Sequence, residues 1–123
     1  MDFSFSEEQT LLRNTIQSFI QDNYDFDKRQ AIVKSEEGMK QENWKQFAEL
    51  GLLGLPFSEE DGGLNFGSVE TMIVAEEFGK GLVVEPYIQT VVTCGGFLRR
   101  ASTSIKEKYI PGVISGQDIW AFA

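Results

Sequence analysis

The chain has 123 residues, a formal net charge of −8 and a hydrophobic content of 41%. That length fits a single domain with its own core, and the acidic balance argues against a nucleic-acid partner because phosphate backbones repel such a surface. The chain has no histidine and one cysteine, Cys94, which excludes histidine catalysis, a histidine metal site and an internal disulfide.

The chain shows no sign of a membrane or export signal. No apolar run approaches the ~20 residues that a membrane-spanning helix needs. The first eight residues lack the basic and apolar regions of a secretory signal, and a lone cysteine suits a reducing compartment. We therefore expect no membrane span and a cytoplasmic location.

The first part of the chain is predicted to hold two helices. Ser6 and Gln9 have the spacing of a capping box, in which each side chain bonds the backbone N–H of the other residue. The helix that they open should run to about Asn23. Asp25 or Asp27 is expected to cap a second, short helix.

A third helix is predicted from about Gln41 to Leu50, with Gly51 as its left-handed stop. A turn follows at Asp61-Gly62-Gly63, where glycine permits the positive φ angles that such turns use. The acidic residues 59–61 could also suggest a Ca²⁺ or Mg²⁺ site, but their spacing does not match an EF-hand loop. A hydrophilic turn is therefore the preferred interpretation.

Ser68 is expected to cap a helix over residues 69–78 that closes at the glycines after it. Glu76 and Glu77 lie next to each other on this helix. Adjacent helical residues point about 100° apart, so these two carboxylates should not face one substrate as an acid–base pair. Glu76 shares a row with apolar residues and is expected to be the buried, hydrogen-bonded carboxylate. We predict no catalytic residue and no metal site in this chain.

Pro86 suits the first turn of another helix, running to about Arg100. Gly95-Gly96 weakens this helix, which indicates close approach by a neighbouring helix or by a ligand chain. Ser104 to Glu107 form a second capping-box pattern, and residues 119–123 have the composition of a strand. The predicted class is all-α: an orthogonal-type helical bundle of about five to six helices with a short C-terminal strand stub.

Three segments occur in an order and spacing that are typical of one family. They are Glu49-Leu50-Gly51-Leu52-Leu53-Gly54-Leu55, then Glu59-Glu60-Asp61-Gly62-Gly63-Leu64, then Ala75-Glu76-Glu77-Phe78-Gly79-Lys80-Gly81. Shorter matches at residues 5–9, 108–111 and 115–117 extend the likeness over nearly the whole chain. In these features the sequence resembles the N-terminal helical domain of the FAD-dependent acyl-CoA dehydrogenases.

The resemblance implies a division of the chain. Residues 1–117 would be the N-terminal helical domain, and residues 118–123 would be the start of the family's middle β-domain. Enzymes of this family bind FAD and remove the α-proton and β-hydride of an acyl-CoA thioester. The glutamate base lies in their C-terminal domain and most flavin contacts lie in their β-domain, so this chain alone is expected to be inactive.

The resemblance also implies site residues and partners. The helix that starts at Pro86 resembles the one that lines the family's acyl pocket, which would place Pro86, Tyr87, Thr90 and Cys94 beside the acyl chain. Phe122 matches the first flavin-side aromatic position. The expected partners of the whole enzyme are acyl-CoA, an electron-transfer acceptor, the missing domains, and other subunits in a homo- or hetero-oligomer. The alternative is a stand-alone helical interaction module without catalysis.

Overall fold

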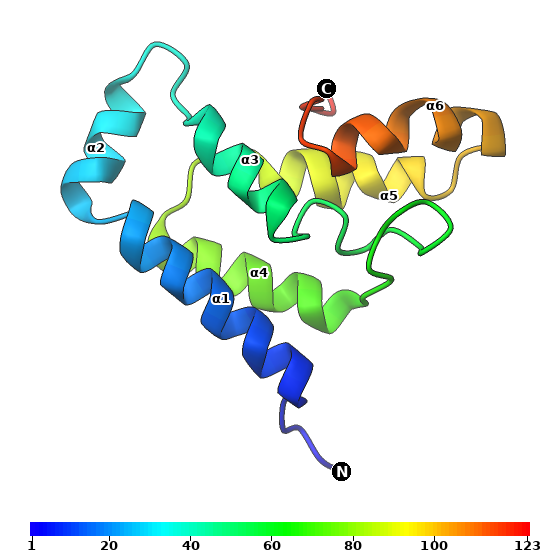
Figure 1. The fold of residues 1–123 in the computed structure, drawn as a ribbon, viewed down its shortest axis with the longest axis horizontal. Coiled ribbons are helices and arrows are strands. Elements are labelled where there is room, and N and C mark those ends of the chain that lie inside the picture. Colours follow the sequence, from blue (N-terminus) through cyan, green and yellow to red (C-terminus); the bar gives the residue numbers. More distant parts are fainter. The chain divides into compact units, whose positions relative to one another are not determined.

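The computed structural model describes residues 1–123 and is built from helices and loops (Figure 1). The predicted all-α class is confirmed. None of the helices combines the length and the apolar character that a membrane crossing requires. The helical segments, in chain order, are α1 Glu7–Asn23, α2 Phe26–Lys34, α3 Gln41–Glu49, α4 Ser68–Gly81, the π-helix η1 Ile88–Cys94, α5 Gly95–Leu98 and α6 Thr103–Ile114.

The chain forms two compact units. Unit 1 consists of Met1–Met39 and Val69–Val84, and unit 2 consists of Lys40–Ser68 and Glu85–Ala123. Each unit therefore combines two stretches of chain that are distant in sequence. Unit 1 contains α1, α2 and nearly all of α4, whereas unit 2 contains α3, η1, α5 and α6.

The predicted caps of unit 1 are confirmed. The Ser6 hydroxyl accepts a hydrogen bond from the Gln9 backbone N–H at 3.1 Å, and the Gln9 side chain accepts one from the Ser6 N–H at 2.9 Å. Of the two aspartates proposed for α2, Asp25 is the cap, accepting from the Lys28 N–H at 2.9 Å. Both helices therefore begin where their side chains satisfy free backbone donors.

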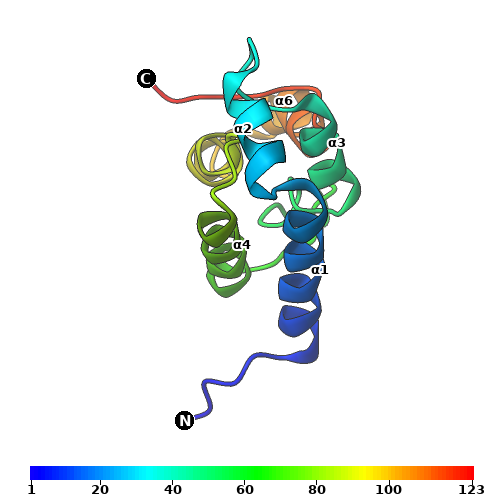
Figure 2. The same cartoon turned by 90° about the vertical axis from the view of Figure 1, so that its left-hand side faces the viewer.

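Helices α1 and α4 run side by side in unit 1 (Figures 1 and 2). The prediction that α4 ends near Phe78 is wrong, because the helix continues to Gly81. A Cβ built on Gly81 would lie 2.8 Å from Cγ2 of Ile20 on α1, so the glycine serves the contact between the two helices. The left-handed residue is Leu82, with φ of 53°, and its carbonyl accepts a hydrogen bond from Arg29 Nε.

The turn glycines of unit 2 have different functions. Gly51 and Gly62 adopt positive φ angles of 81° and 90°, as predicted. Gly63 does not, and there the prediction was wrong. A Cβ at Gly63 would overlap the backbone oxygens of Phe57 and Gly54, so its role is to let two stretches of backbone meet.

The helix predicted from Pro86 to Arg100 is present but not uniform, since its first part, η1, has π-helical hydrogen bonding. Gly95 follows η1, and a Cβ there would lie 3.1 Å from the ring of Phe57. The close neighbour expected at this glycine is therefore a loop side chain within the chain itself. Inserted π turns are uncommon in proteins and often occur near functional sites.

Two predictions for the C-terminal part need correction. Helix α6 starts at Thr103 with Ser102 at its N-cap, so the capping box expected from Ser104 to Glu107 does not form. Residues 119–123 form no strand. A strand requires a partner strand for its backbone groups, and here a side chain bonds the backbone of Trp120 instead.

Candidate functional site

The η1–α5 helix presents three of the predicted acyl-pocket residues to the interior of unit 2. Tyr87, Thr90 and Cys94 are buried, and Pro86 is half-buried. The Tyr87 hydroxyl donates to the Leu52 carbonyl at 2.8 Å. Burial raises the pKa of the Tyr87 phenol, because removal from water disfavours the charged form. These side chains form part of the packing of the helix.

The opposite face of the same helix is open. Ile88 and Phe97 are exposed apolar side chains. Phe97 borders a shallow hollow of about 290 Å³, whose other lining residues are Thr93, Gly96 and Arg100. The Arg100 side chain donates to the Gly96 carbonyl at 2.8 Å, which holds the guanidinium along the helix. This face offers an aromatic ring, small residues and one cation within a short distance.

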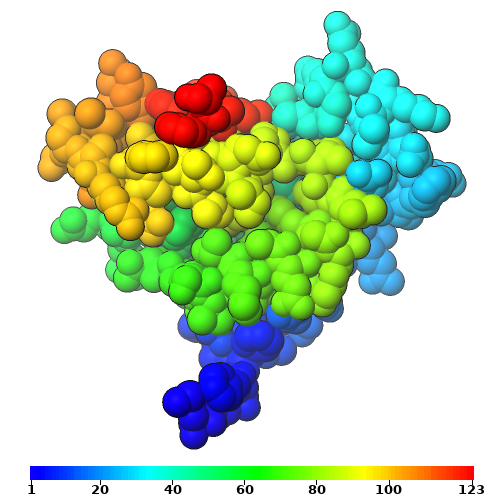
Figure 3. Space-filling model, turned by 180° about the vertical axis from the view of Figure 1, so that it is seen from behind, coloured from blue at the N-terminus to red at the C-terminus, as the bar shows by residue number.

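Phe122 extends this surface from the C-terminal segment. Its ring stacks on that of Phe97, with centroids 5.3 Å apart and an interplanar angle of 18°. In Figure 3 the red C-terminal residues lie over the yellow η1–α5 segment. The two rings remain 61% and 69% exposed, so the stack leaves aromatic surface available. An exposed aromatic pair is unusual enough to suggest a contact surface.

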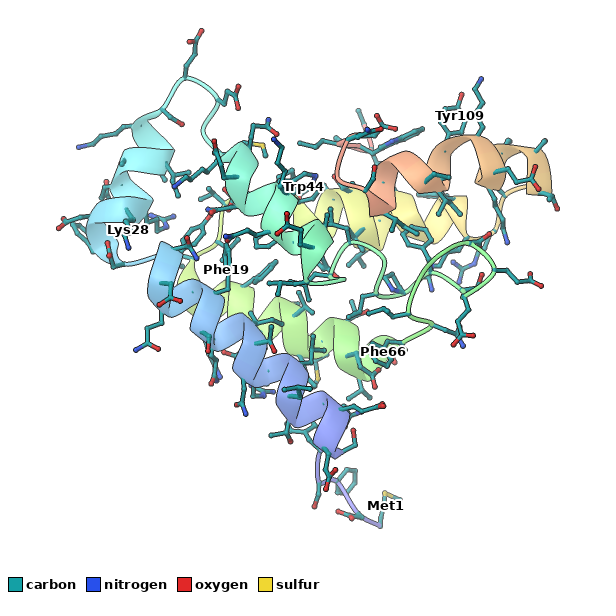
Figure 4. The ribbon with its side chains drawn as sticks, viewed as in Figure 1. Met1, Phe19, Lys28, Trp44, Phe66 and Tyr109 are labelled. Carbon is teal, nitrogen blue, oxygen red and sulfur yellow. The ribbon has the colours of Figure 1, made fainter.

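The backbone of Trp120 is held by one buried side chain. The Thr90 hydroxyl donates to the Trp120 carbonyl at 2.8 Å and accepts from the Trp120 N–H at 3.1 Å. The indole of Trp120 packs edge-on against Tyr109, with ring centroids 5.2 Å apart; Tyr109 is labelled on α6 in Figure 4. These contacts attach the C-terminal segment to both η1 and α6.

A cluster of charges joins α1 to α4 in unit 1. Arg13 pairs with Glu76 at 3.0 Å and with Glu77 at a shorter distance, and Lys80 lies 3.3 Å and 3.2 Å from the same two carboxylates. Glu77 is the buried carboxylate and Glu76 is 44% exposed, so the prediction that Glu76 is buried was wrong. The inward face of α4 contains Ile73, Val74, Glu77 and Phe78.

The pKa values in this cluster follow from its pairing. The hydrogen bond from Arg13 is the largest influence lowering the pKa of Glu76, with Lys80 second. The same carboxylates raise the pKa values of Arg13 and Lys80. All of these shifts favour the charged forms. The cluster is thus a network of two cations and two carboxylates that pair with one another.

The acidic turn at residues 59–61 has a visible structural role. The Ser58 hydroxyl donates to the Asp61 carboxylate at 2.9 Å, and the Asp61 N–H donates to the Ser58 hydroxyl. Lys106 of α6 lies 4.0 Å from the same carboxylate. No group of three or more acidic or cysteine side chains is arranged to hold a metal ion.

Sequence reasoning missed the exposed face of the helix. The signal was present, because Thr93, Gly96, Phe97 and Arg100 follow the i, i+3, i+4, i+7 spacing of one helical face. The predicted residues Tyr87, Thr90 and Cys94 lie on the buried face, and this second row lies on the more exposed side of the helix.

The chain matches the family model described as the acyl-CoA dehydrogenase N-terminal domain over residues 6–117. Among characterised proteins it is 37% identical over 122 residues to the mitochondrial isovaleryl-CoA dehydrogenase of Pongo abelii, covering 96% of this chain and 29% of that protein. It is 29% identical to the NADH-dependent acryloyl-CoA reductase of Anaerotignum propionicum, covering 100% of this chain and 31% of the relative. The chain thus spans about a third of the length of these relatives.

The comparison with solved structures points to the same family as the sequence comparisons. The ChsE4–ChsE5 complex from Mycobacterium tuberculosis matches with a TM-score of 0.88 and 26% identity, over 97% of this chain and 33% of that one. The FAD complex of PigA matches with a TM-score of 0.78 and 28% identity, over 95% of this chain and 31% of that one. With a family model matching 112 of the 123 residues (positions 6 to 117), this chain belongs to the acyl-CoA dehydrogenase family, as its N-terminal domain.

Proposed function

We propose that this chain serves as the N-terminal helical domain of an FAD-dependent enzyme that dehydrogenates an acyl-CoA thioester between its α and β carbons. The observation that carries the proposal is the family match over residues 6–117. Relatives whose names specify acyl-CoA dehydrogenases, including the short-chain enzyme of Clostridium acetobutylicum, support the reaction class. The chain itself would provide a wall of the site rather than its reacting groups.

The division between domains is part of the proposal. Residues 1–117 would form the helical domain, and residues 118–123 would lead into a β-domain. The family match ends at Gln117, which supports a boundary near this residue. In the complete enzyme, a strand of the β-domain would pair with backbone groups of this segment other than those of Trp120, which Thr90 already bonds.

The wall of the acyl pocket would be the helix that starts at Pro86. Pro86, Tyr87, Thr90 and Cys94 remain the proposed acyl-side residues, with Tyr87, Thr90 and Cys94 acting from a buried layer. An apolar, water-excluding wall strengthens the electrostatic interactions of a site. The Tyr87 phenol is buried and donates to the Leu52 carbonyl, so its hydroxyl is satisfied within the wall and does not need water.

Phe122 is the proposed flavin contact. Its ring is 69% exposed and is already ordered by stacking on Phe97, so it presents a flat aromatic face that fits a planar isoalloxazine ring. When bound, FAD would accept the hydride that leaves the substrate. The residues of this chain would shield one side of that ring from water, while other domains would supply most of the cofactor site.

The proposed reaction class also implies partners for the whole enzyme. We propose that the whole enzyme passes electrons to a separate acceptor and assembles with further subunits. One structural neighbour is a complex of two named chains, ChsE4 and ChsE5, which supports assembly as a homo- or hetero-oligomer. The exposed Phe97 and Phe122 rings would be covered in such an assembly or by the adjoining domains.

The test is spectroscopic and uses the full-length gene product. If the proposal holds, the purified protein has the absorbance of oxidised flavin, and this absorbance is bleached under anaerobic conditions when an acyl-CoA substrate is added. The 123-residue chain, measured in parallel, should bind no flavin and show no dehydrogenation. A full-length product without flavin that still binds another protein would instead support the stand-alone interaction module.

A further inference from the structure

The hydroxyl of Thr90 occupies an unusual position for a predicted acyl-pocket residue. Thr90 is 0% exposed, so its hydroxyl requires hydrogen-bond partners within the protein. Both partners belong to one residue, since the hydroxyl donates to the Trp120 carbonyl at 2.8 Å and accepts from the Trp120 N–H at 3.1 Å. Thirty positions separate the two residues in the chain.

This arrangement imitates a pair of strand residues. In a hydrogen-bonded antiparallel pair, one residue bonds both the N–H and the C=O of the residue opposite. The Thr90 hydroxyl makes the same two bonds with a single atom. Two bonds to one peptide residue determine its orientation as well as its place, so the segment cannot rotate freely about Trp120.

Phe122 follows Trp120 by two residues, so the orientation of the Trp120 backbone limits where the Phe122 ring can lie. Trp120 packs against Tyr109, and Phe122 stacks on Phe97. Because Phe122 is 69% exposed, its own packing holds it only in part. The fixed point nearest to it in the chain is the Thr90 contact.

We infer that Thr90 is a positioning residue whose hydroxyl holds the Trp120 backbone and thereby presents the Phe122 ring to the cofactor. This inference rests on the proposed function for the role of Phe122, whereas the hydroxyl contact itself does not depend on it. Thr90 would thus influence flavin binding through the path of the chain.

The first experiment measures amide hydrogen exchange by NMR in the 123-residue chain. The Trp120 amide should exchange about fivefold more slowly than those of Ala121 and Phe122, the factor expected of one net hydrogen bond. Thr90→Val, which removes the hydroxyl at nearly constant volume, should abolish this protection. Thr90→Ser should retain it, and Thr103→Val, at an exposed position on α6, should leave it unchanged.

The second experiment measures FAD dissociation from the full-length gene product. Thr90→Val should release flavin severalfold faster than wild type at equal helicity, and Thr90→Ser should restore the wild-type rate. Equal flavin release by wild type and Thr90→Val, with Trp120 protection lost, would overturn the positioning role and leave the proposed function intact. If the wild-type product holds no flavin, the proposed function fails. The exchange data would still show whether the Thr90 hydroxyl bonds the Trp120 backbone. A Trp120 amide without protection in wild type overturns the inference before any variant is made.

Discussion

Glu77 of α4 is buried against Arg13 of α1, while the adjacent Glu76, which binds the same guanidinium, is 44% exposed. One arginine therefore contacts two carboxylates in very different surroundings. The buried pair joins the two long helices of unit 1, and Lys80 adds a second cation at the surface. Arg13 Nε is itself buried without a hydrogen-bond partner, so the cluster depends on the carboxylates to balance its charge.

Removal of the Glu77 carboxylate should destabilise the chain more than removal of the Glu76 carboxylate. Glu77→Ala leaves the guanidinium partly buried without its closest partner, and we expect a loss of about 3 kcal/mol in the free energy of unfolding. Glu76→Ala removes an exposed ion pair, and such pairs contribute little to stability. The loss in free energy of unfolding should therefore be much smaller for Glu76→Ala than for Glu77→Ala. Urea unfolding followed by circular dichroism measures both. Equal losses would show that the burial of Glu77 has no energetic consequence.

Acid should weaken the cluster in a predictable direction. Arg13, and then Lys80, lower the pKa of Glu76 below its ordinary value of 4.5. The unfolded chain then binds this proton more readily, so the stabilisation is complete above the ordinary pKa and is lost as the pH falls through the lowered one. The urea midpoint should decline below about pH 5, and less steeply in Glu76→Gln. Parallel declines in the two proteins would contradict this.

Two glycines of α4 form a matched pair. Gly79 is exposed and a Cβ there meets nothing within 4 Å, so Gly79→Ala should stabilise the chain by up to about 1 kcal/mol through helix propensity. At Gly81 the Cβ would lie 2.8 Å and 2.9 Å from two atoms of Ile20. Gly81→Ala should therefore destabilise by about 1–3 kcal/mol as the two helices are forced apart. Thermal unfolding of both variants measures the difference, and stabilisation by both would refute the close contact.

The N-terminus of α3 is capped by Glu85, a residue that is distant from the helix in the chain. The N-cap residue Lys40 makes no side-chain cap, and the buried Glu85 carboxylate accepts from the Lys40 N–H at 3.1 Å and from Asn43 Nδ2 at 3.3 Å. Glu85→Ala should cost about 2 kcal/mol, since it removes the acceptor of the buried Asn43 amide and of the Lys40 N–H. Glu85→Gln keeps one acceptor oxygen and should lose less.

The control for this prediction is Glu107→Ala, at an exposed position on α6. Surface substitutions of this kind usually change stability by less than about 0.5 kcal/mol. Chemical denaturation should therefore show the smallest loss for Glu107→Ala, a larger one for Glu85→Gln and the largest for Glu85→Ala. A change in Glu107→Ala as large as that in Glu85→Ala would mean that net charge, and not the cap, is responsible.

The sequence alone was sufficient for features governed by near neighbours in the chain. The capping box of Ser6 and Gln9, the Asp25 cap and the left-handed Gly51 all formed as predicted. Each depends on residues within about four positions, where the chain's own geometry decides which groups can meet. The order of three short segments was likewise enough to predict the family.

The tertiary structure decided what depends on contacts between distant segments. Which of Glu76 and Glu77 is buried follows from the side of α4 that packs on α1, and here that packing selects Glu77 although the local apolar row had favoured Glu76. Glycine is needed at position 81 because Ile20 lies against it, and at position 63 because two stretches of backbone meet there. Thr90 holds Trp120 because a buried hydroxyl must find partners, and only the folded chain brings those partners within reach.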